Sequence, residues 1–408
     1  MRINKYLPLA FIYFFINSVA LPFGLTFTAI LSPVFYWWIL KERKKDVLLP
    51  FFACLSPFLI IHFLNGVDAR VYITSILNYS AVYIFCQAFY TFLKVAEDPE
   101  KIFRKILWIN FVLCLLAIPI YFTSYSDLLW SDQALTEGID NFKRLRLFTY
   151  EASYYATLFT PLFFFYFVQI ILHQNKMNTW LLLLMILLPF ILSFSIGVIS
   201  AVLFSIVLTY IIYFGRLTRK KRVLSMLLIF GFTTAAVVTI LVLFFPGNTI
   251  FVRVENIFLG TDTSGKGRTS DAFILAWDIM KQKSLIWGVG AGQIKVLGGD
   301  IIRSYYLYAL DYDKIAIPNA AAETLAIFGY VGLGIRVLIE LFFFFYTRVW
   351  NNYYRLLLFL FIFLYQFTGS FITNIAEYVI WILAFTNVFS SFDSKDLMVI
   401  RNNKSSLS

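Results

Sequence analysis

The sequence predicts an all-α, polytopic membrane protein with about twelve transmembrane helices. Of its 408 residues, 60% are hydrophobic and 14% are charged, whereas soluble domains carry roughly a quarter charged residues. The apolar segments are continuous runs of about 16 to 22 residues, not the alternating strands of about ten residues that build an outer-membrane barrel. Short basic clusters separate these runs, as in loops facing the cytoplasm. The net charge of +11 therefore indicates membrane topology and not a nucleic-acid partner.

Each predicted span is an apolar run bounded by polar or charged residues. The first is expected to be retained, because it lacks the small-residue cleavage pattern of a signal peptide. The spans cover residues 7–22, 24–40, 47–64, 71–93, 104–123, 148–172, 179–193, 196–214, 223–245, 320–346, 356–372 and 376–391.

The basic clusters alternate between the two sides of these spans and predict that both termini are cytoplasmic. Two segments on the outer side are unusually long, residues 124–147 and residues 246–319. The tail, residues 393–408, is polar and is predicted to be disordered.

The long outer segment is predicted to contain a surface helix. Thr269 is suited to cap it, Asp271 falls in its first turn, and Phe273, Trp277 and Met280 follow at helical spacing. Asp271 is explained equally well by a solvated polar face. After the helix, Gly288, Gly290 and Gly292 predict a tight turn, since no preceding strand supports a nucleotide-binding loop.

Two arginines and a glutamate lie where the shorter outer segment meets the sixth span. Arg144 and Arg146 oppose the cytoplasmic bias of basic residues, and Glu151 follows at the start of the helix. Lipid anchoring and the helix dipole offer a structural explanation. Charges at a membrane boundary more often serve function, however, and arginine suits a bidentate grip on phosphate. We therefore expect this segment to contribute to a binding site.

Carboxylates elsewhere offer further candidates. Glu323 lies one turn inside the tenth span, where it is placed to accept a hydroxyl proton. Glu377 and Asn374, at the outer end of the last span, are structural or bind substrate, with nothing to decide between the two. Asp311 and Asp313 resemble a divalent-ion pair, but two carboxylates alone make a poor magnesium site.

Cysteine and histidine chemistry is not expected. The three cysteines all fall in apolar runs, and the two histidines are too few to build a metal centre. We therefore predict no disulfide framework and no metal or other cofactor.

Three patches resemble a known family. Arg144 precedes the element Glu151-x-Ser-Tyr-x-Ala156. A Gly-Arg268 pair precedes Trp277 and the glycine-rich turn, and Asn319 and Glu323 precede a Gly-Tyr-Val-Gly turn. Together with the topology, these patches, residues 144–160, 267–293 and 318–334, resemble the bacterial O-antigen polymerase and ligase superfamily, in particular its polymerase (Wzy) branch.

The resemblance implies a GT-C-like fold and an inverting, metal-independent glycosyltransferase of the bacterial inner membrane. Such an enzyme polymerises repeat units carried on undecaprenyl pyrophosphate, at the periplasmic face and among inner-membrane lipids, and a chain-length regulator is a further partner that the resemblance leaves open. It implies that Arg268 and either Arg144 or Arg146 bind pyrophosphate. Glu151 or Glu323 would then be the base. The other substrate-binding candidates on the three patches are Tyr154, Tyr155, Asp271, Gly290 and Asn319.

Two alternatives remain. The ligase branch typically carries a histidine near the end of the long loop, where this chain has Pro318-Asn319 and no histidine. A flippase or other transporter for lipid-linked oligosaccharides needs charges along a central cavity, and only Arg336 and Glu340 lie deep within a span, where they are spaced to pair with each other. If the polymerase reading holds, Arg144 or Arg146 should converge with Arg268 on one outward-facing cavity.

Overall fold

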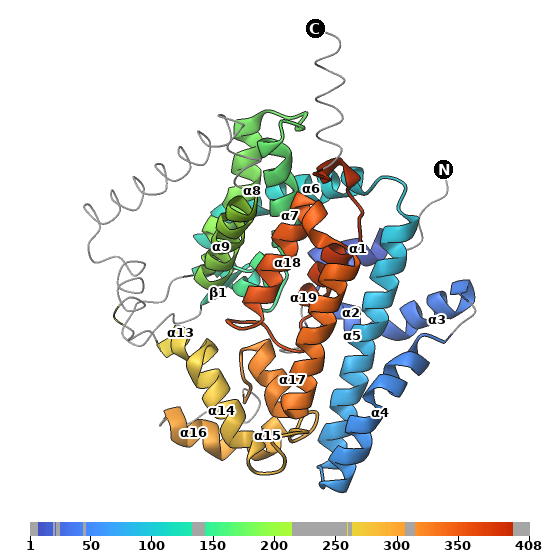
Figure 1. Ribbon diagram of the computed structural model, residues 1–408. Helices are drawn as coiled ribbons and strands as arrows, with labels where there is room; N and C mark the ends of the chain where they lie inside the picture. Colours follow the sequence, from blue (N-terminus) through green and yellow to red (C-terminus); the bar gives the residue numbers. More distant parts are fainter. Residues whose placement is uncertain are drawn as a thin grey trace.

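The computed structural model describes residues 7–18, 21, 25–43, 46–132, 143–213, 259, 263–306 and 315–394. Over these ranges the chain is mostly helical (Figure 1). The predicted span 223–245, the pair Asp311 and Asp313, and most of the predicted tail lie outside the described residues.

The N-terminal half runs from α1 to a small hairpin. Its elements are α1 (Leu7–Phe15), α2 (Phe27–Ile30), α3 (Ser32–Arg43), α4 (Leu48–Leu64), α5 (Ala69–Val95), α6 (Pro99–Tyr121), η1 (Ser126–Leu128), β1 (Trp130–Asp132) and β2 (Lys143–Leu145).

The C-terminal half begins with the central helix α7. Its elements are α7 (Ala152–Ile171), α8 (Thr179–Ser193), α9 (Ile196–Ile212), α13 (Thr263–Arg268), α14 (Ser270–Met280), α15 (Ile294–Leu297), α16 (Gly299–Tyr306), α17 (Ala320–Tyr346), η3 (Val349–Asn351), α18 (Tyr353–Tyr365), α19 (Ile375–Phe385) and η4 (Ser390–Phe392).

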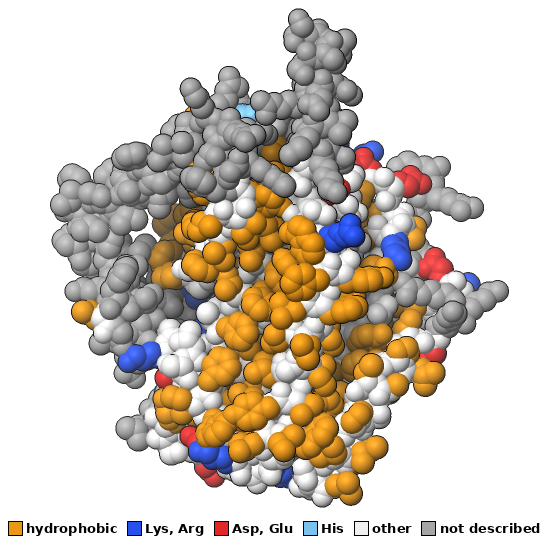
Figure 2. Space-filling model, in the orientation of Figure 1, with side chains coloured by type: hydrophobic (Ala, Val, Ile, Leu, Met, Phe, Trp, Pro, Cys, Tyr) orange, Lys and Arg blue, Asp and Glu red, His pale blue; other side chains and the backbone are white. Residues whose placement is uncertain are grey.

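Among the described residues, four helices are long and apolar enough to cross a membrane: α5, α6, α7 and α17. Helices α4, α8, α9, α18 and α19 are shorter but also apolar. Large apolar side chains such as Leu77 on α5 and Leu338 on α17 are 63% and 67% exposed. Figure 2 shows hydrophobic side chains spread over this face, with charged groups mainly toward its upper and lower rims. Such a surface suits lipid and not water.

Helix α7 is the centre of the larger core. Nearly every residue along it is buried, including Phe159, Phe164 and Phe165, because α8, α9, α18 and α19 pack around it. A helix that is apolar on all sides belongs in the middle of a bundle. A second buried cluster joins α14 to α17 and to Tyr72 of α5. Three tyrosines that line the candidate site, Tyr150, Tyr154 and Tyr365, belong to the larger core or pack against it.

The hairpin β1–β2 is a departure from the all-α prediction. Its strands pair antiparallel, with Ser131 opposite Arg144 and Trp130 opposite Leu145. Trp130 and Leu145 are buried against Cys114 and Ala117 of α6. The strands are three residues long, too short for an alternating pattern to stand out in the sequence.

The predicted span 320–346 is not one continuous helix. Gly329 has φ 66° and ψ −166°, so α17 consists of two helical parts that meet at this residue (Figure 1). The guanidinium of Arg336 donates to Thr324 Oγ1 at 3.0 Å. Residues twelve apart in a straight helix are about 18 Å apart, which is far beyond the reach of arginine. The second part therefore folds back beside the first.

Loop backbone compensates the break. The amide groups of Val289 and Gly290 donate to the carbonyl oxygens of Ala326 and Ile327, each at 3.0 Å. Tyr330 N–H donates in turn to Leu285 O at 3.1 Å. A broken helix is tolerated within a membrane protein only where its freed polar groups find such partners.

The glycines of the two patches permit this backbone contact. A Cβ at Gly288 would lie 2.3 Å from Ile327 O, and one at Gly329 would lie 2.2 Å from Ile286 O. Both residues also have positive φ. The Gly-rich turn is thus one half of a close backbone pairing, for which only glycine fits.

Candidate functional site

A narrow pocket lies at the start of α7 and contains several of the predicted site residues. Its wall combines Glu151 and Tyr154 with Arg268 from the end of α13. The full lining is Tyr150, Glu151, Ser153, Tyr154, Arg268, Pro318, Tyr365, Ser370, Phe371 and Asn374. These residues come from four separate stretches of the chain, so folding assembles this pocket from distant segments.

Glu151 and Arg268 form the charged pair of the pocket. An Arg268 guanidinium nitrogen lies 3.5 Å from Glu151 Oε1, and the two side chains are 36% and 14% exposed. Ser153 Oγ donates to the same carboxylate oxygen at 2.5 Å. Glu151 is the N-cap residue of α7 but makes no side-chain capping bond, so its carboxylate is directed to these partners. The pair presents both a cation and a proton acceptor to the pocket.

Three tyrosines surround this pair. Tyr150 and Tyr154 have ring centroids 4.7 Å apart, and Tyr365 enters from the end of α18. Burial, reinforced by Tyr154 and Glu151, raises the pKa of Tyr150 well above its ordinary value, so its phenol stays neutral. The pocket therefore combines aromatic rings with an ion pair.

Asn319 fixes the position of Arg268. Its Nδ2 donates to Arg268 O at 2.8 Å and to Phe367 O at 2.7 Å, while its Oδ1 caps α17 by accepting from Ala322 N–H at 2.8 Å. Asn319 is fully buried. Asn319 was expected to bind substrate, but it is not among the residues that line the pocket. Its side chain instead holds α13 against the α18–α19 connection.

Arg144 and Arg146 do not line the pocket, and their side chains have other partners. Buried Arg144 donates from Nε to Ser193 O and from Nη2 to Ser195 Oγ, both at 3.0 Å. Arg146 Nη2 donates to Asp127 O at 2.8 Å. The expected convergence with Arg268 is therefore absent in this structure. Pairing in the β hairpin directs Arg144 toward the α8–α9 turn.

The neighbouring Lys143 also has a structural role. Its ammonium group donates to Asp127 Oδ1 at 3.1 Å and to Ser126 Oγ at 2.6 Å. The hydrogen bond from Lys143 lowers the pKa of the Asp127 carboxyl group. All three cations of this segment thus hold it to η1 or to the α8–α9 turn.

Three other predicted substrate contacts lie away from the pocket. Tyr155 is buried and donates to Asn110 Oδ1 at 3.0 Å in the packing of α6 against α7. Gly290 pairs with the broken helix, and a Cβ there would approach Tyr72 to 3.2 Å. Asp271 accepts from Ser270 Oγ at 3.1 Å on the exposed side of α14. The structure gives these residues packing or surface roles.

Helix α14 occupies Ser270–Met280, where the sequence predicts a helix. Thr269 precedes it but does not cap it with its side chain, because Thr269 Oγ1 donates back to Gly265 O at 2.9 Å. The buried face consists of Ala272, Leu275, Ala276, Ile279 and Met280, so Phe273 and Trp277 lie at its edge.

Glu323 lies behind the pocket wall, outside the set of lining residues. Its Oε2 accepts from Ile372 N–H at 2.7 Å. The next residue toward the pocket, Phe371, is part of the wall. Of the two carboxylates proposed as base, only Glu151 therefore reaches the pocket.

The sequence did not decide whether Glu377 and Asn374 are structural or bind substrate, and it gave no indication that Ser370 and Tyr365 belong to a site. Asn374 and Ser370 line the pocket, and Ser370 Oγ donates to Glu377 Oε2 at 2.7 Å. Ser370 has φ 68°, in the left-handed region, and a serine in the sequence does not predict this conformation. The sequence signal for this region is Asn374, which is the N-cap residue of α19 and accepts from Ala376 N–H at 3.0 Å.

No family model and no curated protein matches this sequence.

Proposed function

We propose that this chain is a glycan polymerase embedded in the bacterial inner membrane. Its substrates would be oligosaccharide repeat units on undecaprenyl pyrophosphate, and the growing chain would pass from its lipid carrier to the next unit. The single observation that carries the proposal is the pocket in which Arg268, Glu151 and three tyrosines meet. The resemblance of the three sequence patches supplies the substrate class.

The reaction follows from the charges in the pocket. The acceptor hydroxyl oxygen attacks the anomeric carbon from the side opposite the leaving group, and the bond from that carbon to the pyrophosphate oxygen breaks. Arg268 would stabilise the negative charge that develops on the leaving pyrophosphate. The hydroxyl proton would pass to Glu151. No metal or cofactor enters this scheme.

The ion pair between Arg268 and Glu151 gives substrate binding a specific role. In the empty pocket the guanidinium is partnered by the carboxylate at 3.5 Å. A pyrophosphate carries more charge and offers bidentate geometry, so it would compete for the guanidinium. Glu151 would then lose its cationic partner and become a better proton acceptor just when substrate is present.

The finer topology belongs to the same proposal. It includes twelve spans, a GT-C-like arrangement, cytoplasmic termini and a periplasmic pocket. The alternating basic clusters support the orientation, the apolar exposed face supports membrane embedding, and the GT-C-like arrangement rests on the resemblance. Lipid-linked substrates would reach the pocket from the outer leaflet.

The test is the replacement Arg268→Ala, compared with Lys266→Ala in the same short helix α13, where the lysine is exposed. We expect Arg268→Ala to abolish long-chain polysaccharide while single repeat units still reach the surface, and Lys266→Ala to leave chain length unchanged. Polysaccharide length is read on gels, with expression checked by immunoblot. Normal chain lengths in Arg268→Ala at normal expression would refute the proposal.

A transporter is the second candidate, and one observation favours it. Arg336 lies within the bundle and forms ion pairs with both Glu340 and Glu377, and buried charges often mark transport pathways. The site where unpolymerised units accumulate in a deletion strain separates the two functions. A polymerase defect leaves the units outside the membrane, whereas a flippase defect leaves them inside. Loss of a ligase would instead leave finished polymer on the lipid carrier.

A further inference from the structure

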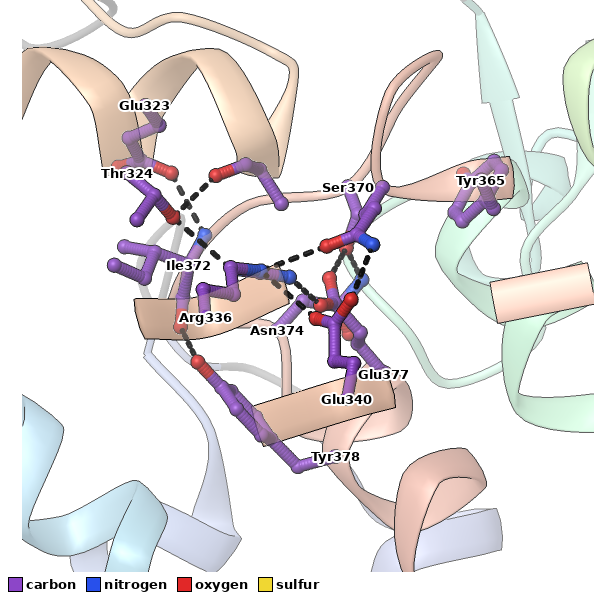
Figure 3. Close-up of polar contacts among 12 residues, drawn as sticks. Glu323, Thr324, Arg336, Glu340, Tyr365, Ser370, Ile372, Asn374, Glu377 and Tyr378 are labelled. Atoms are coloured by element: carbon purple, nitrogen blue, oxygen red, sulfur yellow. Dashed lines mark hydrogen bonds and ion pairs between the residues drawn. The ribbon is translucent and has the colours of Figure 1, made fainter. Parts of the chain in front are cut away.

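Behind the pocket wall, Glu340 and Glu377 pair with the guanidinium of Arg336, and a third carboxyl group, that of Glu323, lies nearby but beyond ion-pair distance. Figure 3 shows Glu323, Glu340 and Glu377 around Arg336, on parts of α17 and α19 that the helix break brings together. Glu377 is fully buried and Glu340 is 5% exposed. This cluster is linked to the pocket through Ser370 and the backbone next to Phe371.

The donors of Arg336 are shared among four acceptors. Its Nε lies 3.2 Å from Glu340 Oε1 and 2.7 Å from Gln366 Oε1, and its Nη1 donates to Thr324. Its Nη2 forms the ion pair with Glu377. The guanidinium can neutralise one carboxylate but not three.

Glu377 and Glu340 are each well supplied with donors. Glu377 accepts from Arg336 and, at 2.7 Å, from Ser370 Oγ. Glu340 accepts from Arg336 and, at 2.7 Å, from Gln366 Nε2. Such bonds favour the ionised form of a carboxyl group, whereas burial opposes it.

Glu323 has the poorest environment for a charge. The hydrogen bond from Ile372 N–H is its one contact to a donor among the described residues, and no described Lys or Arg lies within ion-pair distance. The other titratable groups near the cluster do not compensate, because Tyr79 of α5, Tyr365 of α18 and Tyr378 of α19 are phenols, which cannot supply a positive charge. Lys295 of α15 is a further cation near Glu323, but it too forms no ion pair with it in the described part of the chain.

Charge counting then gives the state of the cluster. With all three carboxyl groups ionised, one guanidinium leaves two uncompensated negative charges. Glu340 and Glu377 are buried and Glu323 is partly buried, so desolvation disfavours this state. A proton bound to Glu323 removes the negative charge that has the fewest hydrogen-bond donors and no ion pair.

We propose that this cluster is a proton-binding site, in which Glu323 holds an exchangeable proton at neutral pH while Glu377 stays ionised against Arg336. The site is distinct from the Arg268–Glu151 pair and does not depend on the glycan chemistry proposed above. Loss of the proton places a negative charge behind the wall formed by Ser370 and Phe371. The affinity of the pocket for an anionic ligand therefore falls as the pH rises through the titration of Glu323.

The test is infrared spectroscopy of the full chain in nanodiscs across a pH series. We expect the carbonyl stretch of a protonated carboxyl group at pH about 7, where glutamates with the ordinary pKa of roughly 4.3 are ionised. The band should shift in D2O, disappear in Glu323→Gln and persist in Glu97→Gln, a control at an exposed position.

Two outcomes would overturn the proposal. One is a wild-type band that is gone by pH about 5.5, as for ordinary carboxyl groups; this measurement needs no variant. The other is a neutral-pH band that persists in folded Glu323→Gln, because the proton would then reside elsewhere. Neither result depends on polymerase activity, so a failed polymerase proposal and a failed proton site are distinguishable.

Discussion

At the scale of single residues, Arg144 and Arg268 show how surroundings decide what an arginine does. Arg144 is buried and donates to Ser193 O and Ser195 Oγ, so its charge holds the α8–α9 turn. Arg268 is 36% exposed beside Glu151 in a pocket. The resemblance implies pyrophosphate binding for Arg268 and for either Arg144 or Arg146. The sequence shows that each residue is charged, but it does not show which group each one contacts. For Arg144 that partner, Ser193 O, lies 49 residues further along the chain.

Arg144→Ala is therefore predicted to weaken the fold. It leaves Ser193 O and Ser195 Oγ buried without this donor, at a cost of about 2 kcal/mol. The melting temperature of the detergent-solubilised protein should fall, whereas Lys281→Ala, at a position 54% exposed, should leave it unchanged. Activity per folded molecule should be preserved in Arg144→Ala. A stable Arg144→Ala protein that no longer makes polymer would restore Arg144 to the binding site.

At the scale of elements, hydropathy located the regular helices well. The predicted span 179–193 coincides with α8, and 47–64 differs from α4 by one residue. It failed where backbone changes direction within an apolar run: α1 ends at Phe15 instead of continuing to residue 22, and α17 breaks at Gly329. Hydropathy predicts which residues are buried in lipid or protein, but it does not predict where the backbone changes direction. The paired partners of the break, residues 285–290, lie in another segment of the sequence.

The break itself can be tested with alanine. Gly329→Ala puts a Cβ 2.2 Å from Ile286 O at positive φ, so we expect severe destabilisation and loss of monodisperse protein in size-exclusion chromatography. Gly334→Ala is the matched control, because nothing lies within 4 Å of its added Cβ and alanine favours the helix by up to about 1 kcal/mol. Equal behaviour of the two variants would mean that α17 is continuous.

At the scale of the whole molecule, composition alone predicts a helical membrane protein, and the structure shows which helices carry the apolar surface. Helices α5 and α17 expose apolar side chains, and α7 is enclosed. The candidate site was only partly predictable. Glu151, Arg268 and Tyr154 were identified from local patches, but Tyr365, Ser370 and Phe371 join them only because α18 and α19 pack against α7. Residues with no distinctive local pattern enter a site through packing alone.

Membrane embedding predicts a strong positional effect of a new charge. Leu338→Asp, on the exposed face of α17, should cost about 3 kcal/mol of insertion free energy and lower the amount of protein resisting alkaline extraction from membranes. Phe122→Asp places the same charge just beyond the end of α6, at a residue that is 82% exposed, and should be tolerated. Equal recovery of both variants would argue against a lipid-facing α17.

The bonds of Asn319 have a consequence for how this chain can vary. The side chain of Asn319, 51 residues further along the chain, donates to the carbonyl oxygens of both Arg268 and Phe367. The location of the guanidinium is thus insulated from the length of the intervening sequence. A change of length after α16 that leaves residues 285–290 paired with α17 would therefore leave the arginine in place, and the pocket would stay constant while that segment varies.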